Sequence, residues 1–359
     1  MFISEIFDTV EIQLTQKRSV VGMNQKKVQD QLKRPLTDLR ISVTDQCNFR
    51  CQYCMPSDVF NEAYPFLQNK ELLSWDEIVA VAEQFAALGV RKIRLTGGEP
   101  LMRKDLPSLI KRLYQLPGIE DLALTTNGVL LPRYAEALKE AGMNRVTVSL
   151  DALDGTLFGK INGRGIGVEP VLQGMQAAHE AGLAVKVNMM VQKGINDHEI
   201  LPMVRYFKTS PYILRLIEFM DVGMTNGWQR ENVVTKAEML AIIEQEFPLM
   251  PIAPHDPGEV ASRFAFVDGE NELGIISSIS DTFCKDCSRA RLSADGKLYT
   301  CLFASRGTDL VTPLRKGLQG EALRSFLQSI WEKRTDRYSD ERQERTGTKK
   351  KIEMSYIGG

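Results

Sequence analysis

The chain has 359 residues, 43% of them hydrophobic and 25% charged, which indicates a folded protein with room for a barrel plus an appendage. Its 45 Lys and Arg residues nearly balance 46 Asp and Glu residues, so no overall field attracts it to nucleic acid or to a membrane surface. No apolar run approaches the roughly 20 residues that cross a bilayer, and residues 1–10, which carry Glu5 and Asp8, lack the basic and apolar regions of a signal peptide. These properties predict a soluble, cytoplasmic protein.

The N-terminal stretch is polar and weakly patterned. This predicts a mobile extension over residues 1–35. Met23 offers a second translation start beside Met1.

Short apolar strands alternate with helical patterns along the first two thirds of the chain. The predicted strands are residues 39–44, 90–96, 119–126, 143–150, 183–191 and 212–220. Glycines that end helical stretches precede four of them, namely Gly89, Gly118, Gly142 and Gly182. The helix before Gly89 is predicted to begin after the N-cap candidate Ser74. Repeated units of this kind predict an α/β fold, an incomplete TIM-type (β/α)6 barrel over residues 36–230.

The alternation ends after Met220, where Gly, Pro and Asn become frequent. One helix is predicted near residues 236–246, and strand-like runs follow at residues 264–269, 273–277 and 297–303. These patterns predict a smaller C-terminal α+β domain over residues 231–340. A tail over residues 341–359 ends in Gly358-Gly359.

One basic residue interrupts four of the six predicted strands, at Arg40, Arg94, Lys186 and Arg215. A single basic residue in a strand is usually a surface group whose charge reaches solvent. Four of them on parallel strands instead converge on one lumen, where burial is tolerable only if an anion balances the charges. The pattern therefore predicts a site for a multiply charged anion such as a nucleoside triphosphate.

All six cysteines fall into two triplets. Cys47, Cys51 and Cys54 form C-x3-C-x2-C directly after the first predicted strand. Three thiolates on a short loop suit a [4Fe-4S] cluster with one open iron. Zinc is the alternative, but it needs a fourth Cys or His nearby, and the chain's three histidines lie at positions 179, 198 and 255.

Cys284, Cys287 and Cys301 form the second triplet, C-x2-C-x13-C. Three ligands without a fourth again favour an iron–sulfur cluster, here with an open position for substrate. A Cys3His zinc site completed by His255 is the alternative.

The first triplet carries an aromatic residue, Tyr53, before its last cysteine, and TGGEPLM follows at residues 96–102. Both motifs resemble the radical SAM superfamily, whose members bind S-adenosylmethionine (SAM) at the open iron and cleave it to a 5′-deoxyadenosyl radical. Together with the second triplet, LTTNG, VSLDAL, VKVNMM and the final Gly-Gly, they make the chain similar to the GTP 3′,8-cyclase family from about residue 36 onward.

The resemblance implies a role for individual residues at matching motif positions. The ligands of the SAM cluster match Cys47, Cys51 and Cys54, and those of the second cluster match Cys284, Cys287 and Cys301. Positions that contact SAM match Tyr53, Gly98, Ser149 and Met220. Positions that contact GTP match Arg40, Arg94, Thr125, Lys186, Arg289 and Arg291, with Arg215 near the substrate. The Gly358-Gly359 tail matches one that reaches toward the active site, whereas Thr282 and Lys285 depart from the common pattern around the second triplet.

The implied activity joins C3′ of GTP to C8 of its guanine, with SAM cleaved, as the first step of molybdenum cofactor biosynthesis. Two [4Fe-4S] clusters and SAM are the implied cofactors. The resemblance implies two partners, an external one-electron reductant and a downstream cyclic pyranopterin monophosphate synthase. It implies neither a nucleic acid nor a membrane as a partner. A monomer and a homodimer both stay open. A different radical SAM enzyme with an auxiliary cluster and a non-catalytic metal-binding protein are the alternatives.

Overall fold

The computed structural model describes residues 28–255, 258–269, 271–342 and 350–358. The strands are β1 (Asp38–Ser42), β2 (Lys92–Thr96), β3 (Asp121–Thr126), β4 (Arg145–Ser149), β5 (Ala184–Val191), β6 (Ile213–Glu218), β7 (Leu249–Ile252), β8 (Ala261–Phe266), β9 (Glu272–Ile276), β10 (Arg289–Leu292), β11 (Lys297–Tyr299) and β12 (Thr308–Asp309). The α-helices are α2 (Trp75–Ala87), α3 (Leu106–Tyr114), α4 (Leu131–Glu140), α5 (Gly155–Ile161), α6 (Glu169–Glu180), α7 (Ile200–Lys208), α8 (Lys236–Ile243), α9 (Val311–Arg315), α10 (Gly320–Glu332), α11 (Tyr338–Glu341) and α12 (Met354–Ile357).

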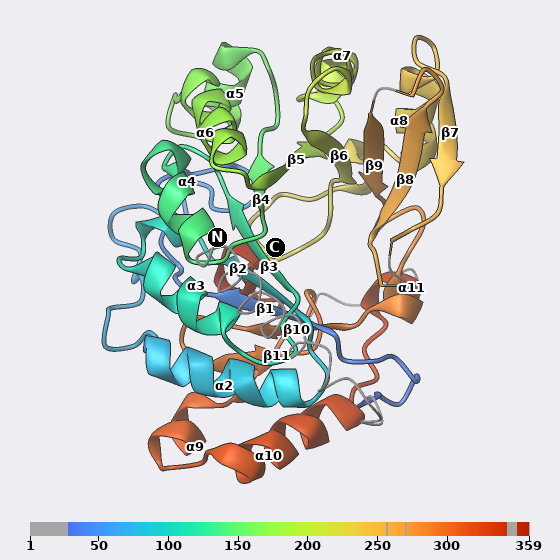
Figure 1. Cartoon of the computed structure of the whole chain (residues 1–359). Helices are drawn as coiled ribbons and strands as arrows, with labels where there is room; N and C mark the ends of the chain where they lie inside the picture. The colour runs from blue at the N-terminus through green and yellow to red at the C-terminus, as the bar shows by residue number, and fades with distance from the viewer. Residues whose placement is uncertain (1–27, 256–257, 270, 343–349, 359) are drawn as a thin grey trace, which may run out of the picture.

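All twelve strands belong to one curved sheet, in the order β12-β11-β10-β1-β2-β3-β4-β5-β6-β9-β8-β7 (Figure 1). The strands from β10 to β9 are parallel, and an antiparallel pair borders them at each end. Helices α2 to α7 cover the outer side of the central strands, and α10 packs on α2 (Figure 1). The predicted incomplete barrel with an additional α+β part is confirmed.

Local sequence signals explain how the barrel helices begin and end. Helix α2 starts at the predicted N-cap Ser74, whose side chain accepts from the Glu77 amide while the Glu77 carboxylate accepts from the Ser74 amide. Gly89 adopts a left-handed φ of 105° directly after the last helical turn and its cap. Gly118 differs from the prediction, because α3 ends at Tyr114 and this glycine lies in the turn that leads to β3.

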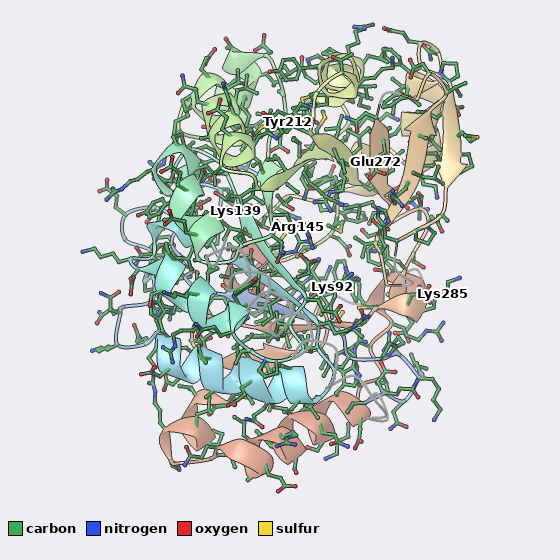
Figure 2. The ribbon with its side chains drawn as sticks, in the orientation of Figure 1. Lys92, Lys139, Arg145, Tyr212, Glu272 and Lys285 are labelled. Atoms are coloured by element: carbon green, nitrogen blue, oxygen red, sulfur yellow. The ribbon has the colours of Figure 1, made fainter. Side chains whose placement is uncertain are left out.

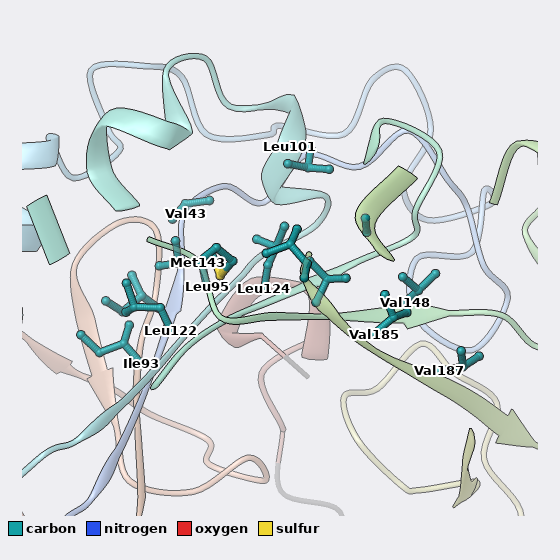
Figure 3. Packing of buried hydrophobic residues seen from close by; sticks show 14 of the residues in the cluster. Val43, Ile93, Leu95, Leu101, Leu122, Leu124, Met143, Val148, Val185 and Val187 are labelled. Carbon is teal, nitrogen blue, oxygen red and sulfur yellow. The ribbon is translucent and has the colours of Figure 1, made fainter. Parts of the chain in front are cut away.

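Successive side chains of the central strands point to opposite sides of the sheet. Ile93, Leu95, Leu122 and Leu124 are buried against the helices in the hydrophobic core (Figure 3). Their neighbours in sequence point to the other side of the sheet, into the barrel. The inner face is therefore polar, which places the chemistry of this protein inside the barrel.

The C-terminal part of the chain completes the barrel sheet on both sides. Strand β9 pairs with β6, and β10 pairs with β1, both in parallel. Strand β10 was not predicted, since Arg289 and Arg291 interrupt its apolar residues. The predicted domain boundary near residue 230 stays a prediction, because one sheet contains strands from both sides of it.

The predicted N-terminal extension is wrong for its last residues. Asp30 and Arg34 are almost fully buried, and Gln29 forms an isolated β-bridge with Pro35. Residues 1–27, which include both candidate translation starts, lie outside the described residues, as do residues 343–349 and 359 of the predicted tail. Within the described part of the chain, no helix is both long and apolar enough to span a membrane.

Candidate functional site

The first cysteine trio lies on the loop after β1 and lines a cavity inside the barrel. The residues expected to contact SAM line the same cavity: Tyr53, Gly98, Ser149 and Met220. Arg50 holds the loop, since its guanidinium donates to the carbonyl oxygens of Phe60 at 2.6 Å and of Cys47 at 2.7 Å. The structure thus brings together ligands and contacts that are spread over 174 positions of the sequence, from Cys47 to Met220.

Polar partners position the other side chains of this cavity. The Tyr53 hydroxyl donates to Asp151 at 2.8 Å, and the other carboxylate oxygen of Asp151 accepts from the Met190 amide at 2.9 Å. Glu99 accepts from the Thr126 hydroxyl at 2.8 Å. Burial raises the pKa of Asp151 to about 6 and that of Glu99 to about 7.

The Gly97-Gly98 turn approaches the loop that leads to Cys47. The Gly98 amide donates to the Thr44 carbonyl at 2.8 Å. A Cβ atom on Gly98 would lie 2.5 Å from the Gln46 carbonyl carbon and closer still to its oxygen. These glycines are thus required by the backbone of the cysteine loop itself.

The second cysteine trio lines an adjoining cavity under β1 and β10. Arg40, Arg94, Arg215, Arg289, Arg291 and Arg334 line this cavity together with the three cysteines. Asp336 is the one carboxylate that the described residues place in the lining. Such an excess of positive charge suits a multiply charged anion.

Three of these arginines form a row across the sheet. Arg40 lies directly between Arg94 on β2 and Arg291 on β10 in the strand register. The guanidinium of Arg94 donates to Thr125 and Thr147 at 3.2 Å each, and Arg215 donates to Thr147 at 3.1 Å.

The described residues only partly balance the charges of the arginines on β1, β2 and β6. The Nε atoms of Arg40, Arg94 and Arg215 are buried without a hydrogen-bond partner. Burial lowers the pKa of Arg40 to about 10, and burial followed by the charges of Arg145 and Arg40 lowers that of Arg215 to about 9. An anion in the cavity would satisfy these donors.

The two cavities share one wall, formed by Thr125, Asn188, Ile217 and Met220. The two cavities therefore adjoin inside the barrel. Asn188 is a polar residue of this wall, and its side-chain oxygen is buried without a partner among the described residues.

Lys186 and Gly358 lie outside the linings of the two cavities. Lys186 lies on the same face of β5 as Asn188 but outside the lining of the arginine cavity. Gly358 packs against Thr96, and its carbonyl oxygen accepts from Arg291. The last described residue of the tail therefore reaches the arginine row, while Gly359 lies outside the described residues.

The second trio lies in a more positive environment than the first. Burial raises the pKa of Cys47 to about 11 and that of Cys301 to about 12. Burial acts in the same direction on Cys287, but the charges of Arg289 and Arg334 outweigh it and hold the pKa of this thiol at about 6.

The donor sets fit clusters better than single ions. Among the described residues, no three His, Cys, Asp or Glu side chains are close enough to hold one metal ion. Three thiolates on one [4Fe-4S] cluster bind three different irons, so they stand farther apart than the ligands of a single ion. His255 is exposed, and no Cys3His zinc site forms within the described part of the chain.

The departures from the family pattern leave the second cavity intact. The Thr282 hydroxyl donates to Asp340 at 2.5 Å and so ties the loop to α11. Lys285 is exposed beside α11, on the outside of the loop (Figure 2). Neither residue lines the cavity.

Comparison with known proteins decides the family. Residues 41–207 match the model of the radical SAM superfamily, and residues 212–340 match that of Molybdenum Cofactor Synthesis C. The GTP 3′,8-cyclases of Staphylococcus aureus strains MRSA252, JH9 and Newman are each 51% identical to this chain over 338 residues, 93% of this chain and 99% of theirs. This chain belongs to the GTP 3′,8-cyclase family.

Solved structures show that the fold of this cyclase family member is shared with proteins of low sequence identity. Streptococcus suis SuiB bound to S-adenosylmethionine has a TM-score of 0.55 at 14% identity, covering 82% of this chain and 68% of SuiB. SuiB bound to its precursor peptide SuiA has a TM-score of 0.56 at 14% identity, covering 92% and 77%. At this identity the likeness concerns the fold alone.

Several residues of the cyclase site were not predicted from the sequence. Glu99 lies in the GGEP motif, Asp151 in VSLDAL and Asn188 in VKVNMM, but these motifs assign no role to the three residues. Arg334 carries no motif signal in a single sequence, since its neighbours come from other segments of the chain. The alternation of residues along β4 and β5 also indicates that Asp151 and Asn188 face the barrel interior.

Replacing Gly98 with alanine is expected to weaken SAM cleavage by this cyclase about tenfold or more and to lower its melting temperature. The added methyl group meets backbone atoms that cannot rotate away, so either the turn or the cysteine loop must shift. Formation of 5′-deoxyadenosine and thermal unfolding measure the two effects. Gly155→Ala is the matched control, because no atom lies within 4 Å of its added Cβ. Equal effects in both variants would contradict the proposed close approach.

Proposed function

We propose that this chain converts GTP into (8S)-3′,8-cyclo-7,8-dihydroguanosine 5′-triphosphate while SAM is cleaved to 5′-deoxyadenosine and methionine. The observation that carries the proposal is the pair of adjoining cavities. Each contains three cysteines, they share one wall, and six arginines line the second of them. This arrangement holds two reactants next to each other and balances the charge of a triphosphate.

The first trio would hold the cluster that binds SAM. A cluster and SAM held there would supply, on one-electron reduction, the chemistry that removes hydrogen from the ribose C3′. Tyr53, fixed by Asp151, and the Gly97-Gly98 turn shape the cavity around SAM. Ser149 and Met220 line its opposite side.

The second trio would hold the cluster whose open iron binds the guanine base. Arg289 and Arg291 lie on β10 next to this trio, and Arg40 and Arg94 continue the row across the sheet. These cations would bind the triphosphate. The ribose then lies at the shared wall, where Thr125 and Asn188 offer polar contacts.

The barrel also protects the reaction from water. Ile217, Met220 and the neighbouring strands close the shared wall, and the tail packs over Arg291 and Thr96. A carbon radical formed there meets its substrate before solvent. We propose that the tail contributes to turnover through this closure.

The cellular setting is part of the proposal. An external one-electron reductant supplies electrons, and a cyclic pyranopterin monophosphate synthase consumes the product. The location proposed is the cytoplasm, where both substrates are abundant. A homodimer and a monomer are equally compatible with a site built from one chain.

An anaerobic assay with SAM, dithionite and GTP tests the function. The reconstituted protein is expected to consume GTP, release 5′-deoxyadenosine in proportion and form a product with the mass of GTP. Omission of dithionite and replacement of GTP by ATP are the controls. SAM cleavage that leaves GTP unchanged would indicate a different radical SAM enzyme. A colourless, zinc-loaded protein without SAM cleavage would indicate a non-catalytic metal-binding protein.

The KM for GTP is expected to rise as the pH increases from 7 to 9. Burial, followed by the charges of Arg215 and Arg145, lowers the pKa of Lys186 to about 8. The ammonium that would attract the triphosphate is therefore lost as the pH passes 8, and GTP binding takes up a proton. Steady-state kinetics across this range measure the effect. The Lys186→Arg variant stays charged and should flatten the profile, whereas a flat profile in the unchanged protein would contradict the role of Lys186.

A further inference from the structure

A buried ion cluster stands behind the second cysteine trio. Asp30 accepts from the Nε of Arg34 at 2.6 Å and from Arg334 at 3.2 Å, and the side chains of all three are at most 2% exposed. Arg334 follows the last turn of α10, and Asp30 and Arg34 precede β1. Segments from opposite ends of the chain therefore meet at this point.

Both arginines of the cluster bind the cysteine loop directly. Arg334 donates to the carbonyl oxygen of Cys287 at 2.7 Å and to the sulfur of the same residue at 3.1 Å. Arg34 donates to the carbonyl oxygen of Cys284 at 2.8 Å. The contacts fix two of the three cysteines relative to the barrel.

The sulfur of Cys287 is one of the groups that surround the Arg334 guanidinium. Two carboxylates pair with this cation, Asp30 at 3.2 Å and Asp336 at 3.7 Å. The Asp336 contact is longer than a hydrogen bond, and this carboxylate accepts one from Thr300. Asp30 and the Cys287 residue therefore accept the hydrogen bonds of Arg334, and the sulfur contact at 3.1 Å is one of them.

We propose that Arg334 is a positioning residue that sets the reduction potential of the second cluster through its bond to the Cys287 sulfur. The inference rests on the proposed cluster at Cys284, Cys287 and Cys301. Asp30 and Arg34 hold the guanidinium in place from behind.

A donor to a ligand sulfur raises the potential of an iron–sulfur cluster. Reduction adds negative charge to the cluster and its thiolates, so a cationic hydrogen bond is stronger in the reduced state. Arg289 and Arg334 both line the cavity where GTP is proposed to bind, and both lie beside Cys287. The side chain of Arg334 is 1% exposed and is also held by Asp30 and by the Cys287 carbonyl, so its contact with the sulfur is part of the fold itself.

The test uses full-length protein in which Cys47, Cys51 and Cys54 are replaced with serine, so that only the second cluster titrates. Iron and sulfide are measured after anaerobic reconstitution, and the potential is determined by a titration followed by electron paramagnetic resonance. Arg334→Gln is compared with Arg334→Lys, which keeps the charge but loses the planar fork. Arg324→Gln is the matched control, because it removes a cation of α10 that contacts Gln84 and no cysteine.

Arg334→Gln is expected to make reduction of the cluster about tenfold less favourable, which corresponds to a potential about 59 mV lower for one electron. Arg334→Lys should shift the potential less, in the same direction, and Arg324→Gln should leave it unchanged. An iron-loaded Arg334→Gln protein with an unchanged potential would overturn the inference, as would an equal shift in Arg324→Gln. If the Gln variant does not fold, an unshifted Lys variant overturns it. Zinc in the starting protein would instead overturn the proposed function itself.

Discussion

Replacing Cys284 with serine is expected to remove about four irons per chain and to reduce GTP conversion on the order of a hundredfold or more. SAM cleavage by dithionite should persist. The reason is that Cys284 lines the arginine cavity and not the SAM cavity, which contains the other cysteine trio. Iron and sulfide content, 5′-deoxyadenosine release and GTP consumption measure the three outcomes.

The complementary variant Cys47→Ser serves as the control. It should also lose about four irons, but SAM cleavage should disappear while iron at the second trio stays. The two variants together assign each cluster to its function. If Cys284→Ser abolished SAM cleavage as well, or retained its full iron content, the separation into two sites would be wrong.

The fold was predictable where pattern and local signals coincide. Apolar strands separated by capped helices predicted β1 to β6 near their observed positions, and Ser74 caps α2 as expected. Strand β10 was missed because its two inward arginines break the apolar run that usually marks a buried parallel strand. The same inward arginines are what the cavity requires, so the missed strand belongs to the site.

The candidate site was predictable where a residue carries its own chemistry. Cysteine triplets and basic residues inside apolar strands can be recognised in the sequence. The structure places the six cysteines and the predicted strand arginines in the linings of the two cavities, whereas Lys186 lies outside both linings. The sequence predicts a mobile extension for Asp30 and Arg34, because their partners outside this segment lie far along the chain: Arg334 for Asp30 and the Cys284 carbonyl for Arg34, 304 and 250 positions away. Contacts of such separation follow from topology and leave no local pattern.

Replacing Arg94 with methionine is expected to weaken GTP binding about a hundredfold and to leave SAM binding unchanged. Arg94 lies next to Arg40 in the arginine row, and its Nε is buried without a partner. A hydrogen bond to a charged group contributes about 1.5–3 kcal/mol, and a hundredfold change in Kd corresponds to about 2.8 kcal/mol. Calorimetry with GTP and with SAM on the reconstituted protein measures both affinities.

The same substitution is expected to leave the melting temperature of the GTP-free protein at least as high as before. Burial, followed by the charges of Arg40, Arg145 and Arg215, lowers the pKa of Arg94 well below its usual value, so this cation opposes folding until an anion binds. Arg91→Met is the matched control, because Arg91 is 40% exposed and pairs with Glu120 on the surface, so its loss should change neither property. A purely structural role for Arg94 would lower stability and GTP affinity together. If the site binds its ligand at the expense of stability, the substitution changes stability and GTP affinity in opposite directions.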